Sequence, residues 1–342
     1  MAKKYGKYAF QFEKEIYIAG YGNVVGKKEG EGPMAALFDR IEEDFYCGKK
    51  TLEQAEVHLQ QTALENALTR AGIKREELDL VGAGDLLNQC ISSAYSFRDS
   101  NVPYIGLYGA CSTMALSTLI SAMSIEAGLS VKAAAFTSSH FGTAERQYRF
   151  PLEYGGQRPP SAQHTVTASG AVILSRQKTS LRLAGGAFGA IQDKGVTDAN
   201  NMGGAMAPAA LKLILDYLHE TGTIPSDYDL ILTGDLGAIG AEIVRDLAQK
   251  DGVDLHHRYN DCGLMIYDLQ KQDMHAGGSG CGCSAAVLTA YVLPKLEKGE
   301  LKEVLFLSTG ALMSPLSVMQ GESIPAIAHL LHLKHEAKEK KQ

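Results

Sequence analysis

Residues 68–86 read LTRAGIKREELDLVGAGDL, and residues 218–236 read LHETGTIPSDYDLILTGDL. The two stretches align without a gap. The residues that they share are Leu68/Leu218, Gly72/Gly222, Asp79/Asp229, Leu80/Leu230, Gly84/Gly234, Asp85/Asp235 and Leu86/Leu236. A second match joins residues 109–139 to residues 282–310. An internal duplication of this length predicts two similar half-domains, with a functional site between them.

The same order of elements is expected around each copy. Apolar positions at three- and four-residue spacing predict long helices at 51–72 and 206–222, each ending at a glycine. Residues 112–127 and 284–298 are apolar on all sides, as helices buried in a large protein are. Strands are expected at 15–26, 79–84, 131–139, 170–176, 181–189, 229–234 and 304–310.

Alternating strands and helices predict an α/β protein with mixed, mostly parallel sheets that are covered on both faces. One buried helix from each half predicts the layer order α-β-α-β-α. We expect an N-terminal half over residues 1–178, a C-terminal half over 179–331 and a charged tail over 332–342. Residues 138–169 interrupt the first copy with prolines, glycines and arginines, which predicts a long loop that serves as a lid or a dimer contact.

Composition excludes several classes of protein. A net charge of −6 argues against a nucleic-acid partner. The chain shows neither a run of 18 apolar residues nor the apolar segment of a secretory signal, so we expect no transmembrane segment and no signal peptide. The spacing of Cys281 and Cys283 is not that of a zinc knuckle, and we expect neither a metal nor a cofactor.

Cys111 is the first candidate for chemistry. It precedes the expected buried helix at 112–127, where unpaired N–H groups and the helix dipole stabilise a thiolate. The alternative is a small buried hydrophobic residue, which cysteine often is.

Two similar α/β halves with a cysteine before the first buried helix resemble the thiolase superfamily, which includes the ketoacyl synthases. The likeness is carried by SAQHTVTASGAVILSR at 161–176 and by the glycine-rich turn, helix and strand at 277–311. The resemblance implies that Cys111 stands where the family's cysteine takes the acyl group. It also implies that histidine and asparagine, or two histidines and a second cysteine, come from loops of the second half.

The second half departs from that pattern. Asp235 stands where the histidine-bearing loop is expected, and residues 280–282 occupy the second loop, with His275 a few residues earlier. A carboxylate in such a pocket disfavours a thiolate and an enolate. We therefore expect a protein that is not an enzyme, with Cys111 marking a vestigial nucleophile position. Asp235 could otherwise be a helix N-cap or a calcium ligand.

Residues 141–171 and 313–330 make the whole chain similar to the stage V sporulation protein AD family of spore-forming bacteria. The resemblance implies that the protein binds dipicolinic acid, alone or with calcium, and takes part in its uptake into the developing spore. It further implies a homodimer, peripheral at the forespore or spore inner membrane, whose partners are the other subunits of a sporulation channel complex.

A planar dianion such as dipicolinate requires donors, cations and an apolar slot. The expected ligand-binding residues are Cys111, His140, Arg146, Arg149, Arg158, His164, Asp235, His275, Cys281 and Cys283. For each arginine the alternative is a surface or dimer-interface ion pair. The rival function is an acyltransferase or condensing enzyme with Cys111 as nucleophile and His140, His164 or His275 as base.

Overall fold

The computed structural model describes residues 2–148, 158–255 and 257–337. Within these ranges thirteen strands form one continuous hydrogen-bonded sheet. The main path runs through β12 (Tyr259–Asp261), β11 (Leu230–Thr233), β14 (Glu303–Ala311), β15 (Ala326–His335), β10 (Leu181–Phe188), β3 (Tyr17–Gly26), β9 (Ala168–Ser175), β7 (Lys132–Ser139), β5 (Leu80–Gly84) and β6 (Tyr104–Gly106). The halves meet at β10, which pairs with β3 through Arg182 and Tyr17 and with the short N-terminal strand at residues 9–11.

Strand direction changes from the ends of this path to its centre. The outer strands pair in parallel, β5 with β6 and β7 in one half and β11 with β12 and β14 in the other. The inner strands pair antiparallel, as β3 with β9 and β10 with β15. The prediction of a mixed sheet is confirmed, whereas the expected parallel majority is wrong, because each half closes on an antiparallel return strand.

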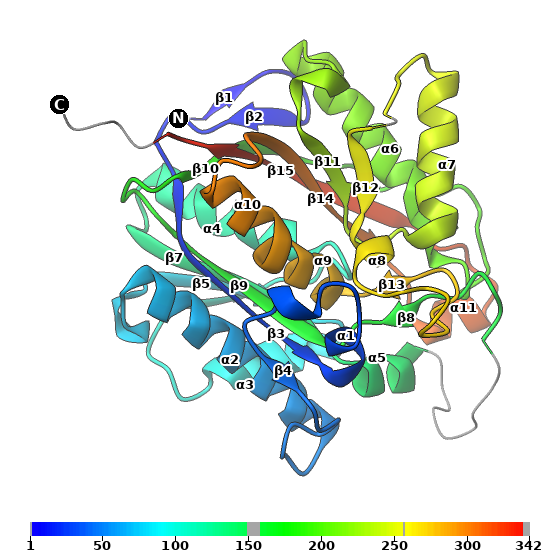
Figure 1. Ribbon diagram of the computed structural model, residues 1–342, viewed down its shortest axis with the longest axis horizontal. Coiled ribbons are helices and arrows are strands. Elements are labelled where there is room, and N and C mark those ends of the chain that lie inside the picture. The colour runs from blue at the N-terminus through cyan, green and yellow to red at the C-terminus, as the bar shows by residue number, and fades with distance from the viewer. Residues whose placement is uncertain (1, 149–157, 256, 338–342) are drawn as a thin grey trace.

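Helices cover both faces and fill the middle, as predicted (Figure 1). On the outer faces, α2 (Leu52–Ala71) packs against β3 and β9, and α6 (Met202–Thr221) packs against β14 and β15 and beside α7 (Gly237–Lys250). Between the sheet halves lie α4 (Thr113–Ala127) and α9 (Cys281–Val287), the latter continued by a π-helical turn, Leu288–Val292, and α10 (Leu293–Glu297). The remaining short elements are β1 (Lys3–Lys4), β2 (Ala9–Gln11), α1 (Lys27–Gly30), β4 (Ile41–Glu42), α3 (Ile91–Phe97), α5 (Phe141–Tyr148), β8 (His164–Thr165), α8 (Cys262–Met265), β13 (Gly278–Ser279) and α11 (Pro315–Met319).

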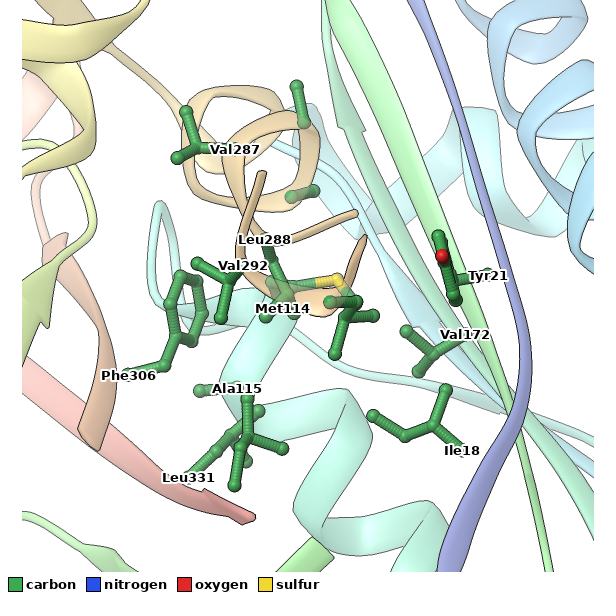
Figure 2. Close-up of a cluster of buried hydrophobic side chains, with 14 of the residues drawn as sticks. Ile18, Tyr21, Met114, Ala115, Val172, Val287, Leu288, Val292, Phe306 and Leu331 are labelled. Carbon is green, nitrogen blue, oxygen red and sulfur yellow. The ribbon is translucent and has the colours of Figure 1, made fainter. Parts of the chain in front are cut away.

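The two central helices form the core of the molecule. Figure 2 shows side chains of α4 and of the α9 segment packed between strands of both halves. The side chains labelled there are Ile18, Tyr21, Met114, Ala115, Val172, Val287, Leu288, Val292, Phe306 and Leu331. Burial of apolar area on this scale is the main force that holds the halves together.

One described helical segment, Ala110–Ala127, is long and apolar enough to cross a membrane by length and composition alone. The sequence had led us to expect no such segment. Of this stretch, 72% is buried inside the protein, as is typical of a core helix.

Residues 138–169 are not the continuous loop that the sequence predicted. The segment begins with the end of β7, forms the helix α5, and returns through β8 to the start of β9. Residues 149–157 of this segment lie outside the described part of the chain.

The duplicated aspartates make the same contacts in both halves. Asp79 accepts hydrogen bonds from two consecutive backbone N–H groups where β7 begins, and Asp229 does the same where β14 begins. Each thereby joins the strand that follows it to a strand more than fifty residues later. The repeat therefore preserves contacts that set strand order.

The duplicated glycines Gly72 and Gly222 end α2 and α6 with φ of 66° and 67°. A Cβ atom would meet no neighbouring atom at either position, so only the left-handed backbone requires glycine there. We predict that Gly72→Ala or Gly222→Ala lowers the free energy of unfolding by about 1 kcal/mol. Gly→Asn at the same positions should lose less, because asparagine tolerates this conformation. Urea unfolding measures both, and equal stability of the alanine variants and the native chain would contradict the assignment.

Candidate active-site pocket

Cys111 lies in a tight turn directly before α4. Ser112 N donates to Gly109 O at 3.1 Å, and the intervening Ala110 has a φ of 50°. A positive φ is uncommon for residues other than glycine and is found at functional turns. The turn directs the cysteine toward the interface between the two halves, and 6% of Cys111 is exposed.

Asp235 follows β11 and is fully buried beside Cys111. Its Oδ1 accepts a hydrogen bond from Thr309 Oγ1 at 2.7 Å, and its Oδ2 accepts one from Gly280 N at 2.8 Å. Helix α7 has no side-chain cap, so the N-cap alternative for Asp235 is wrong. Because both oxygens already accept hydrogen bonds, the geometry does not favour a calcium ion at this carboxylate.

Asp261 holds the loop that carries Asp235, and sequence reasoning missed it. Its carboxylate accepts hydrogen bonds from Leu236 N, Gly237 N and Thr233 Oγ1, at 2.9, 2.9 and 2.7 Å. Burial raises the pKa of Asp261 to about 7. Its only sequence signal was a polar residue at the end of a short strand, which does not distinguish it from a surface turn.

The electrostatics of the pocket keep Cys111 protonated. Burial raises the pKa of its thiol well above the ordinary value, and the charge of Asp235 raises it further. Burial also raises the pKa of Asp235 to about 6, against the effect of hydrogen bonds from Thr309, Gly280 N and the Cys111 thiol. The predicted stabilisation of a thiolate by the helix terminus is therefore outweighed by burial next to a carboxylate.

Cys111 lines a small apolar pocket. The pocket is lined by Leu86, Tyr108, Ala110, Cys111, Ala144, Tyr148, Thr165, Met202, Ser279, Ala311 and Met313. The hydroxyls of Tyr108 and Tyr148 lie 2.7 Å apart, and Tyr148 also donates to Leu86 O. The pocket volume of about 30 Å³ is enough for only one or two water molecules. Since α5 supplies Ala144 and Tyr148, the predicted lid segment does form part of the pocket wall.

The two predicted cysteines of the second half, Cys281 and Cys283, lie in different parts of the structure. Cys281 packs in one apolar cluster with Cys111, and its Sγ donates to Ser138 O at 2.8 Å. Cys283 instead points into the core between the sheet halves. Burial raises the pKa of both thiols well above the ordinary value. Only Cys281 is thus brought to the site.

The predicted histidines do not line the Cys111 pocket. His140 is buried with Nε2 2.9 Å from Phe45 O, and His164 stacks on Phe141 with 4.3 Å between ring centroids. His275 lies 3.7 Å from the Asp273 carboxylate. The base that the rival acyltransferase function needs is therefore not supplied by these three residues.

The predicted arginines that the structure describes also lie outside the pocket lining. Arg146 forms an ion pair with Glu53 at the surface, which was its alternative role. Arg158 donates to Asp273 O at 3.1 Å. Arg149 falls outside the described residues. Across residues 2–148, 158–255 and 257–337, no group of three or more His, Cys, Asp and Glu side chains could hold a metal ion.

Comparison with known proteins identifies the family. The family model for stage V sporulation protein AD matches residues 6–334. The chain belongs to this family. Stage V sporulation protein AD from Bacillus subtilis strain 168 is 41% identical over 324 residues, covering 95% of this chain and 96% of that protein.

Solved structures outside the stage V sporulation protein AD family confirm the thiolase-like fold. A variant of OleA from Xanthomonas campestris matches with a TM-score of 0.59 and 14% identity, covering 95% of this chain and 99% of that one. The 3-oxoacyl-[acyl-carrier-protein] synthase III from Aquifex aeolicus matches with a TM-score of 0.55 and 14% identity, covering 92% and 99%. At this identity the likeness concerns the fold alone.

The contact between Cys111 and Asp235 can be tested by thiol reactivity. We predict that Asp235→Asn increases the alkylation rate of Cys111 by iodoacetamide at pH 8 several-fold, because loss of the neighbouring charge lowers the pKa of the thiol. Mass spectrometry of the Cys111 peptide measures the rate. The exposed Asp246→Asn on α7 is the control and should leave it unchanged. Equal rates in both variants would show that Asp235 does not control the thiol.

Proposed function

We propose that this sporulation protein is a non-catalytic member of the thiolase-like fold that binds dipicolinic acid in the Cys111 pocket. It would do so, alone or with calcium, for uptake of the acid into the developing spore. Its partners would be the other subunits of a channel complex at the forespore or spore inner membrane. The family assignment supports the sporulation role; the ligand and the complex are the proposal.

The observation that carries the non-catalytic part is the buried Asp235 carboxyl beside Cys111. Acyl transfer to a thiol needs a base or a lowered pKa at the nucleophile. Here burial and the carboxylate both raise the pKa of the thiol. The site therefore keeps the architecture of an acyl-transfer pocket while its nucleophile stays neutral.

The walls of the pocket suit a flat aromatic acid. Tyr108, Tyr148 and Met313 provide polarisable surfaces for a ring. The Tyr148 hydroxyl donates its hydrogen to Leu86 O, whereas the Tyr108 hydroxyl, on a side chain that is 45% exposed, can turn to donate to a carboxylate. The present volume of about 30 Å³ is far below the roughly 300–1,000 Å³ of ordinary ligand sites. Binding therefore requires part of the pocket wall to move outward.

A homodimer would extend the sheet at β6. This strand ends the main path of the sheet, and Ile105 on it and Tyr108 just after it are 39% and 45% exposed. Exposed edge strands are natural sites for pairing with another chain, and a symmetric dimer pairs each edge with its own copy. Such pairing would place a second chain close to Tyr108 at the mouth of the pocket.

Isothermal titration calorimetry with dipicolinate tests the binding proposal. We expect saturable heat for the native protein and about tenfold or more weaker binding for Tyr108→Phe, which loses the donor to a charged group. Tyr95→Phe is the matched control, because Tyr95 is 49% exposed and does not line the pocket. It should bind like the native protein. Absence of saturable heat up to millimolar dipicolinate would overturn the proposal.

A further inference from the structure

A second and larger cavity lies on the other side of β8 from Cys111. Successive residues of a strand point to opposite faces. Accordingly, Thr165 lines the Cys111 pocket, whereas His164 lines a cavity of about 290 Å³ that also borders α1 and the start of α5. Its volume approaches that of ordinary small-molecule sites.

The cavity contains a buried carboxyl group with an oxygen that lacks a partner. Glu29 on α1 is 1% exposed and contributes to the wall. Its Oε1 accepts hydrogen bonds from Thr167 N at 2.9 Å and from the hydroxyl of Tyr267, which comes from the second half of the chain. Its Oε2 has no hydrogen-bond partner among the described residues. An unsatisfied buried polar atom is costly and calls for a ligand or a similar explanation.

The aromatic residues of the cavity wall indicate what kind of ligand would fit. Phe45, Phe141 and His164 line the cavity, and the Phe141 and His164 rings stack at an interplanar angle of 17°. These rings form an apolar surface, and aromatic faces also attract cations. A ligand that fills this space must therefore carry an apolar group of about the size of one ring.

Carboxylates outnumber lysines around the cavity. Its lining includes two lysines and four acidic residues, namely Lys27, Lys28, Glu29, Glu42, Glu43 and Asp44. Lys27 is already 3.9 Å from Glu43, and Arg40 and His58 both contact Glu42. Lys28, Glu43 and Asp44 are exposed, so Glu29 is the buried charge of the wall. The electrostatics thus favour a cation over an anion at this site.

We propose that this cavity binds a small organic amine with an aromatic or branched apolar body, whose ammonium group donates to Glu29 Oε2. The site is separate from the Cys111 pocket and does not depend on dipicolinate binding. The ammonium would satisfy the open oxygen, while Phe45 and Phe141 enclose the apolar body.

Phenethylamine is a suitable probe, with phenylacetate as the anion that carries the same ring. At pH 8, one unit above the value of about 7 to which burial raises the pKa of Glu29, most of this carboxyl is ionised. Ligand-observed NMR on the native protein should give saturable binding of phenethylamine, with a Kd on the order of a millimolar, and at least about tenfold weaker binding of phenylacetate. Equal binding of phenethylamine and phenylacetate would overturn the proposal. No binding of phenethylamine up to about 10 mM would also overturn it.

Two variants locate the site. Glu29→Gln keeps the side-chain shape and should weaken phenethylamine binding at least about tenfold, whereas Glu43→Gln at the exposed mouth should change it less than about twofold. Phe141→Ala removes a wall without altering charge and should also weaken binding, which covers the case in which Glu29→Gln does not fold. If a folded Glu29→Gln or Phe141→Ala variant binds phenethylamine as tightly as the native protein, the amine binds elsewhere and the proposal is contradicted. Dipicolinate titration of the same variants reports separately on the Cys111 pocket.

Discussion

The hydrogen bonds that Thr309 and the Gly280 N–H donate to the buried carboxyl of Asp235 join three segments that are distant in sequence: the end of β11, the end of β14 and the turn before α9. Two of these segments line the pocket beside the Cys111 turn, the turn before α9 through Ser279 and the end of β14 through Ala311. A carboxylate can be buried only where donors compensate its lost hydration. The donors that stabilise this carboxyl also hold it next to the Cys111 thiol. The hydrogen bonds that join these segments of the second half therefore also keep the thiol neutral, because the carboxyl raises its pKa.

Comparison of the two halves explains how this arrangement fits a duplicated fold. In the first half, Asp85 accepts hydrogen bonds from Leu87 N and Ser93 N, and so organises its own following segment. In the second half, Asp261 performs that task for the segment after β11. The equivalent Asp235 is thereby released to face Cys111. The duplication preserved the aspartate, and a change of partner altered its role.

The sequence predicted the scaffold well, because helix periodicity, glycine stops and apolar strands are local signals. The long helices α2 and α6 and the central helix α4 appear within a few residues of their expected bounds. The match between the two copies drew attention to Asp235, and the structure places this residue beside Cys111. Prediction failed where tertiary contacts decide the outcome. His164 and Thr165 are neighbours that face different cavities, Arg146 is drawn to Glu53, and α5 forms within a segment whose prolines and glycines indicated a loop.

We propose that the thiolase-like scaffold has kept its cysteine and has lost acyl transfer. Incubation of the native protein with acetyl-CoA, followed by intact-mass measurement, tests it most directly, with the Cys111→Ala variant as the control for background acylation. The neutral thiol beside Asp235 predicts that the native mass gains no more acetyl group than the variant. A stoichiometric adduct on the native protein, mapped to Cys111 and lost in Cys111→Ala, would contradict the account.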